Sequence, residues 1–104
     1  MCDMPLAKLE VFDDALVSLS GFAKALSHPA RLSILQHLAK EKEMACHSIV
    51  DALPLSQAAC SRHVAELVKA GLVKFRNHGN YVYYRIEKKA LSQFCKSMSA
   101  ALHH

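Results

Sequence analysis

The residues best suited to a chemical role lie between positions 56 and 70, where apolar residues recur at helical spacing. On a helix, the outer face near the start of this segment carries hydroxyl, amide, guanidinium and imidazole groups: Ser56, Gln57, Ser61 and Arg62, with His63 at the edge. Hydroxyl and amide groups can bond to base edges in the major groove of DNA, and a guanidinium binds guanine or phosphate. This face therefore predicts contact with double-stranded DNA. Taken alone, the same residues also fit an ordinary solvated helix face.

A second polar group follows at Arg76, His78 and Asn80. Apolar and polar residues alternate on both sides of Asn77-His78-Gly79-Asn80, and this pattern is typical of a β-hairpin over about 72–86. We expect Arg76 and the hairpin tip to lie along the neighbouring DNA backbone or minor groove. A polar helix followed directly by a basic, aromatic hairpin favours the DNA-reading interpretation over the solvated face.

Five helical segments are expected to position these residues. Their limits follow from apolar spacing and from capping signals such as Pro29, Ser56 and Gly71. The expected helices cover 6–27, 29–40, 45–53, 56–70 and 87–102. With the hairpin before the last helix, the order is that of a mainly α winged helix-turn-helix with a small β-hairpin, whose helix-turn-helix spans about 45–70.

The motifs of residues 20–90 resemble those of the ArsR (ArsR/SmtB) family of winged helix-turn-helix transcriptional regulators. The stretch Ala25–Leu32 resembles the family's entry to its second helix. Residues 55–57, 61–64 and 70–73 resemble its recognition helix, and Arg76–Ile86 resembles its wing. The resemblance implies a homodimer, closed by the first and last helices, that represses transcription until a signal releases it.

The family's two standard metal sites are not matched. Many relatives bind metal or arsenite through Cys-x-Cys, but Ala45 and His47 occupy those outer positions here, and soft metal ions require the thiolates. Other relatives use an Asp-x-His pair and two later histidines, but Lys88 and Ala90 replace the pair, and only His104 matches a later position. One ligand of four makes no zinc site, so we expect no metal and no cofactor.

The four cysteines lie at positions 2, 46, 60 and 95, without a Cys-x-x-Cys pair. Cys46, Cys60 and Cys95 fall on apolar helix faces, so we expect them to be core thiols. A redox-sensing repressor that uses Cys46 or Cys95 is the alternative, and it requires an exposed or activated thiol.

The sequence offers no parts for an enzyme. It has no glycine-rich phosphate loop and no acid pair or nucleophile in a recognisable setting. Ser61, Arg62 and His63 are consecutive, and consecutive helical residues point about 100° apart, so they cannot act as a nucleophilic group.

Length and composition set the remaining expectations. A chain of 104 residues suggests a single domain over 1–104, and 13 Lys and Arg against 9 Asp and Glu give a net charge of +4, which is compatible with a polyanionic partner. Apolar runs are too short to cross a membrane and no secretion signal is evident, so we expect a cytoplasmic protein.

The first and last helices carry apolar seams that a small monomer cannot easily cover. The residues expected between two subunits are Leu9, Leu16, Leu19, Leu91, Phe94 and Met98. Two-fold symmetry would place the reading helices about 34 Å apart, which predicts a palindromic operator. A winged-helix protein-interaction module without DNA binding is the competing class, because the hairpin tip carries little charge. The sequence does not indicate the operator, the regulated genes or the inducer.

Overall fold

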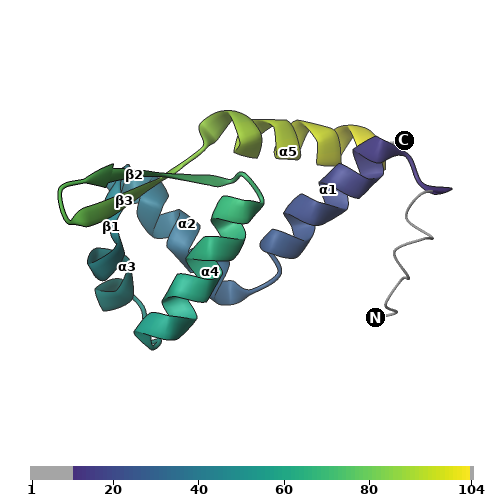
Figure 1. The fold of residues 1–104 in the computed structure, drawn as a ribbon. Coiled ribbons are helices and arrows are strands. Elements are labelled where there is room, and N and C mark those ends of the chain that lie inside the picture. The colour runs from purple at the N-terminus through teal and green to yellow at the C-terminus, as the bar shows by residue number, and fades with distance from the viewer. Residues whose placement is uncertain (1–10, 104) are drawn as a thin grey trace.

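The computed structural model describes residues 11–103, which form five helices and a three-stranded antiparallel sheet (Figure 1). In chain order the elements are α1 (Asp14–Ala25), α2 (Pro29–Glu41), β1 (Met44–Ala45), α3 (Cys46–Ala52), α4 (Gln57–Lys69), β2 (Val73–His78), β3 (Tyr81–Ile86) and α5 (Lys88–Leu102). The sheet, α2, α3 and α4 pack together at one end, while α1 and α5 contact each other at the other end. This arrangement confirms the predicted winged helix-turn-helix.

Capping side chains mark where four of the helices begin, including α5, where the Glu87 carboxylate accepts from the Lys89 amide at 3.3 Å. The Ser56 hydroxyl accepts a hydrogen bond from the Ala59 amide at 3.1 Å, which confirms the predicted cap of α4. His28 caps α2 in the same way, because its Nδ1 accepts from the Ala30 amide at 3.0 Å. The Asp13 carboxylate accepts from the Ala15 amide at 2.9 Å and caps α1.

The first helix is shorter than predicted. It begins at Asp14 and ends at Ala25, so residues 11–13 and 26–27 lie outside it, and the predicted residues 6–10 lie outside the described chain. The start is set by the Asp13 cap, whose backbone is not helical. The apolar spacing continues through this cap and therefore gives no sign of it.

The hairpin is confirmed. Its first strand, β2, is longer than predicted because it extends through Asn77 and His78, whereas β3 covers 81–86 as predicted. β2 and β3 pair from Val73↔Ile86 to His78↔Tyr81, leaving only Gly79 and Asn80 as the loop. Gly79 has a positive φ of 62°, which glycine adopts readily in two-residue hairpin loops. The sheet order is β1-β3-β2, and the two-residue strand β1 was not predicted, because two residues are too few to show a period.

The core is built from α1 to α4 and the start of the hairpin. Its buried residues are Ala25, Ile34, Leu35, Leu38, Ile49, Val64, Leu67, Leu72 and Val73. On α2, Leu32 is 49% exposed while Ile34 is buried. Residues two apart on a helix point about 200° apart, so burying Ile34 turns Leu32 outward.

α5 differs from the other long helices because the chain itself buries none of its fifteen residues, all of which the structure describes. Phe94 packs edge-on against Phe22 of α1, with ring centroids 6.0 Å apart. Leu91, Phe94 and Met98 remain half-buried within the described chain. Within residues 11–103, none of the helices combines the length and the apolar character that crossing a membrane requires.

Candidate nucleic-acid interface

α4 presents one apolar and one polar face. Cys60, Val64 and Leu67 are buried on its inner side. Gln57, Ser61 and Arg62 are exposed on its outer side.

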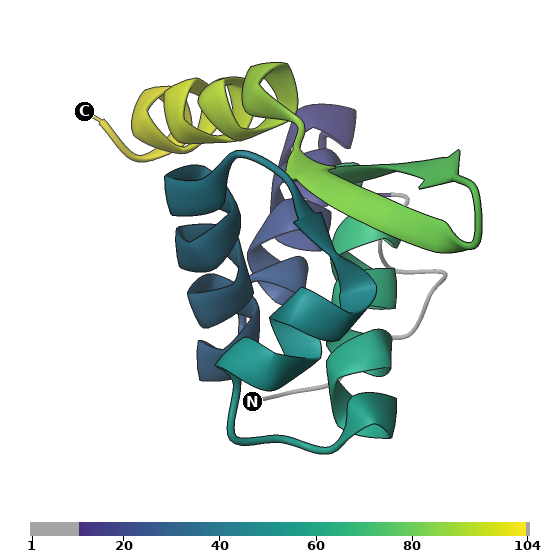
Figure 2. The ribbon, with the colours of Figure 1, turned by 90° about the vertical axis from the view of Figure 1, so that its left-hand side faces the viewer.

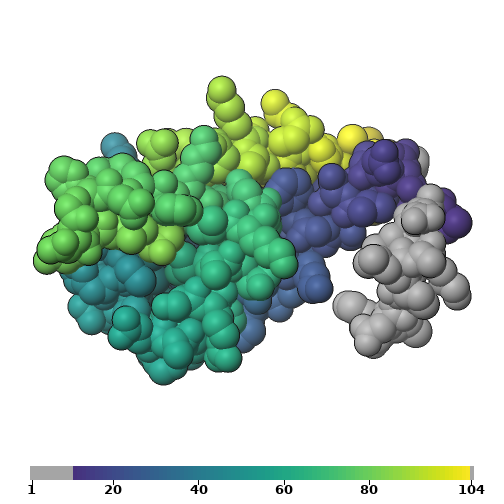
Figure 3. Space-filling view, viewed as in Figure 1, coloured from purple at the N-terminus to yellow at the C-terminus, as the bar shows by residue number. Residues whose placement is uncertain are grey.

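α3, the connecting turn and α4 form a helix-turn-helix, and the hairpin tip lies on the same side of the molecule as α4 (Figure 2). In the space-filling view, the surface of α4 lies open beside that of the hairpin (Figure 3). A polar helix and a projecting hairpin therefore share one accessible side of the molecule.

Ser56 stands at the start of α4 and is exposed. Its oxygen accepts from the Ala59 amide, while its hydroxyl hydrogen can still donate to another group. Within residues 11–103, the side chains of Gln57, Ser61 and Arg62 make no hydrogen bond or ion pair with another residue. Their polar groups are therefore available to a partner.

His63 lies differently from the other predicted contacts. Its Nδ1 accepts a hydrogen bond from Nε of Arg31 at 3.2 Å, and its ring stands 4.4 Å from that of His28. Burial, followed by the positive charges of His28, Arg31 and Arg62, lowers the pKa of His63. His63 is therefore half-buried, neutral and engaged with the protein rather than turned out with Gln57.

Arg76 is exposed on β2 but is held by a carboxylate. Its Nε and Nη2 donate to the two oxygens of Glu43 at 2.9 and 2.7 Å, and its guanidinium lies 4.9 Å from the ring centre of Tyr83. The hydrogen bond from Arg76 is the main cause that lowers the pKa of Glu43, and the same bond raises the pKa of Arg76. Arg76 could bind a phosphate only by exchanging this partner.

The hairpin tip presents His78 and Asn80, both exposed as a DNA contact would require. The His78 ring stands 6.3 Å from Tyr83, on the side of the wing where Arg76 lies. Exposed Tyr81 extends the tip towards His47 of α3, with 5.7 Å between ring centres. Sequence reasoning omitted Tyr81, although its alternation with Val82 could have identified it as an outward residue.

The residues predicted to lie between subunits fall into three groups. Leu16 is 48% exposed, whereas Leu19 is only 8% exposed and leaves little for a second subunit to cover. Leu91, Phe94 and Met98 on α5 are half-buried. Leu9 lies outside the described residues.

The cysteines match the core expectation only in part. Cys60 is buried, as predicted, but Cys46 is half-buried and Cys95 is exposed on α5. The described chain covers the apolar stripe of α5 only in part and buries none of its residues, so Cys95 is not a core thiol of the protomer. Among residues 11–103, no three His, Cys, Asp or Glu side chains are grouped closely enough to hold a metal ion.

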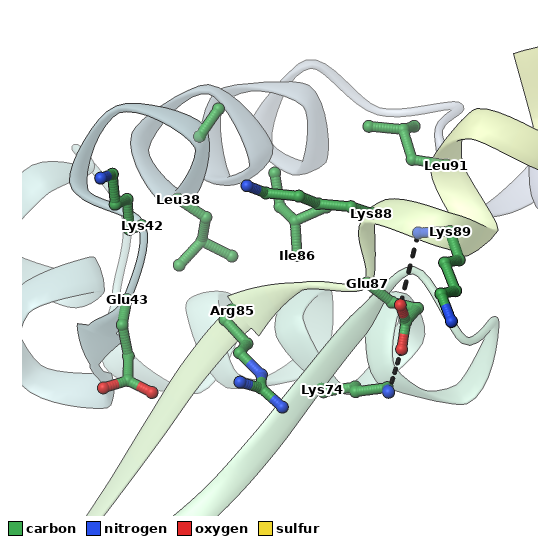
Figure 4. Close-up of a pocket in the computed structure, with 11 residues that line it drawn as sticks. Leu38, Lys42, Glu43, Lys74, Arg85, Ile86, Glu87, Lys88, Lys89 and Leu91 are labelled. Atoms are coloured by element: carbon green, nitrogen blue, oxygen red, sulfur yellow. Dashed lines mark hydrogen bonds and ion pairs between the residues drawn. The ribbon is translucent and has the colours of Figure 1, made fainter.

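A charged groove lies between α2, β3 and α5, and none of the residues that line it is a predicted DNA contact (Figure 4). Leu38, Ile86 and Leu91 line it with apolar surface, and Lys42, Arg85 and Lys88 are among its basic side chains. Its two acids are partnered, since Glu87 pairs with Lys74 and Glu43 pairs with Arg76.

The helix-turn-helix, its open polar helix and the adjoining hairpin define a winged helix-turn-helix protein. A family model described as a helix-turn-helix domain matches residues 26–75. This match covers α2, α3, α4 and the start of β2.

Known proteins identify the family more closely. The nodulation protein NolR of Rhizobium meliloti is 34% identical over 86% of this chain and 72% of its own length. The transcriptional repressor SmtB homolog of Synechocystis is 30% identical over 83% of this chain and 71% of its own length.

A solution structure from Mycobacterium bovis has the same fold, with a TM-score of 0.69 and 28% identity over 100% of this chain and 93% of that one. It is described as a homodimeric winged helix-turn-helix DNA-binding domain and a possible ArsR-family transcriptional regulator. The chain belongs to the ArsR/SmtB family of winged helix-turn-helix transcriptional regulators.

Proposed function

We propose that the chain is a homodimeric repressor that binds a palindromic operator in double-stranded DNA. The observation that carries this proposal is the exposed outer face of α4, where Gln57, Ser61 and Arg62 have no partner among the described residues. The opposite face of the same helix is fixed in the core by Val64 and Leu67. A rigid helix with free polar groups on its outside is suited to enter the major groove.

The side chains have separate roles in this proposal. Gln57 and Ser61 reach base edges, and Arg62 binds a base or a phosphate. Ser56 and the amides at the start of α4 bind phosphate, although the Ser56 oxygen also caps the helix. His78 and Asn80 follow the neighbouring backbone, and Arg76 joins them by leaving Glu43.

The homodimer rests on uncovered apolar surface on α1 and α5. α5 has an apolar stripe with no residue buried by its own chain, and exposed side chains continue this surface at Phe12, Leu16 and Leu102. The solved relative from Mycobacterium bovis, described as homodimeric, supports the same assembly. Two-fold symmetry would then set the two copies of α4 about 34 Å apart along the DNA.

A protein-interaction module without DNA binding is the second candidate. The observation that favours it is the Arg76–Glu43 ion pair, which neutralises the arginine of a wing whose tip, residues 77–80, holds no lysine or arginine. Free polar groups on α4 favour the repressor instead.

A mobility-shift experiment separates the two candidates. The intact protein is titrated into the duplex upstream of its own gene and into a random duplex of equal length. The repressor predicts a complex with the upstream duplex that is about 10³-fold tighter than the random complex. Failure to shift either duplex at micromolar protein would favour the interaction module.

A further inference from the structure

Arg31 occupies the junction of three helices. From the first turn of α2, its Nε donates to Nδ1 of His63 on α4 at 3.2 Å. Its Nη1 donates to the carbonyls of Lys24 and Ala25, at 3.4 and 3.3 Å, at the end of α1. A guanidinium is favourable there because the C-terminal end of a helix carries partial negative charge.

The contact between Arg31 and His63 works only while the imidazole is neutral. An accepting Nδ1 needs its lone pair, so the ring proton must be on Nε2. The ionisable groups that act on His63 are His28 beside α2, Arg31 on α2 and Arg62 on α4 itself. All three carry or can carry positive charge, so a protonated His63 would be repelled by groups at the start of α2 and on α4 itself.

We propose that Arg31 is a positioning residue that holds α4 against α1 and α2 through its hydrogen bond to neutral His63. We call this hydrogen bond the Arg31–His63 lock, and protonation of His63 breaks it. The inference rests on the proposed reading of DNA by α4, and it adds a regulatory input to that function. The proton would take the Nδ1 lone pair, which leaves two donors facing each other. The hydrogen bond is then lost and Arg31 remains bonded to α1 alone.

The sign of the pH dependence follows from the surroundings of the ring. Burial and the neighbouring positive charges lower the pKa of His63 from its ordinary value of 6.5. The lock is therefore closed at and above neutral pH, and it opens as the pH falls through the lowered pKa. Cys60, Val64 and Leu67 still hold α4 in the core, so the fold survives while the helix gains freedom to shift.

Two substitutions at position 63 separate the hydrogen bond from simple packing. His63→Gln keeps an oxygen acceptor that does not titrate, whereas His63→Phe keeps a ring beside His28 but cannot accept. The measured quantity is the ratio of operator affinity to random-duplex affinity, followed from about pH 7.5 down to the lowest pH at which the wild type remains folded. A ratio is used because uniform electrostatic attraction to DNA cancels in it.

The wild-type ratio should fall about tenfold over this pH series, the factor expected from losing one hydrogen bond to a charged group. His63→Gln should hold its ratio within about twofold, and His63→Phe should be low at every pH. His37→Gln is the control, because it removes a histidine of α2 that is not among the proposed DNA contacts and should keep the wild-type fall. A His63→Phe ratio equal to wild type at every pH would overturn the proposal.

A DNA-free measurement distinguishes this proposal from the proposed function. Amide hydrogen exchange in α4 is compared between wild type and His63→Gln at the same pH, which cancels the intrinsic effect of pH on exchange. At the low end of this pH series the wild-type amides should exchange about fivefold faster. Equal exchange rates would overturn the lock even if DNA binding is found, while faster exchange without DNA binding would refute only the repressor.

Discussion

Arg76 has two competing partners, Glu43 in the free protein and the phosphate that we propose for it in the complex. Glu43→Gln removes the competing carboxylate and frees the guanidinium. Affinity should rise about threefold for operator and random DNA alike, because an exposed ion pair is weak and a phosphate contact carries no sequence information. The salt dependence should also become steeper, by about 1 in each subunit.

Glu41→Gln is the matched control for this experiment, since it removes the same charge from an exposed residue at the end of α2. It should leave the salt slope unchanged. Identical slopes for both variants would show that Arg76 does not contact phosphate. Arg76→Ala should weaken binding to all sequences about equally.

Cobalt provides a test at the scale of single ligands. Cys46 has Ala45 and His47 as neighbours, and the described residues hold no group of three ligands. Cobalt(II) should therefore give no tetrahedral thiolate absorption and should change operator affinity by less than about twofold. Stoichiometric binding with loss of the DNA complex, reversed by a chelator, would contradict this prediction.

The sequence predicted the outer face of α4 because that face depends on local periodicity alone. It could not predict the partners of Arg76 and His63. Glu43 lies 33 residues before Arg76, and Arg31 lies 32 residues before His63. Such pairs arise only when the core brings separate elements together, and no local pattern encodes them.

At the scale of elements, the position of α4 depends on its first turn. Ser56→Ala removes the hydroxyl that accepts from the Ala59 amide, and it should lower the free energy of unfolding by about 1 kcal/mol in urea. Ser61→Ala is the control, because Ser61 is exposed, lies inside the helix and should change stability by less than about 0.5 kcal/mol. Equal losses in the two variants would rule out a specific capping role.

The elements themselves were largely predictable. Apolar spacing, Ser56 and the glycine at position 79 indicated α4 and the hairpin. The errors have physical causes: the Asp13 cap interrupts an apolar pattern that continues through it, and β1 forms only because β3 offers it a partner.

At the scale of the whole molecule, the uncovered α1–α5 surface predicts a dimer at micromolar concentration. Leu16→Glu places a charge on this surface and should shift sedimentation towards the monomer, because burying an unpaired charge is costly. Leu32→Glu is a matched control, since Leu32 is 49% exposed and Leu16 is 48% exposed. The proposed homodimer would be contradicted if the wild type sedimented as a monomer, or if Leu16→Glu and Leu32→Glu dissociated equally.

Sequence-specific reading by α4 is tested most directly by Gln57→Ala, measured on the operator and on a random duplex at several salt concentrations. Gln36→Ala is the control, because Gln36 is an exposed glutamine on α2. Gln57→Ala should cost roughly 1–3 kcal/mol on the operator and much less on random DNA, while Gln36→Ala should change neither. If Gln57→Ala remains a folded dimer with wild-type affinity for both duplexes, α4 does not read the bases as proposed.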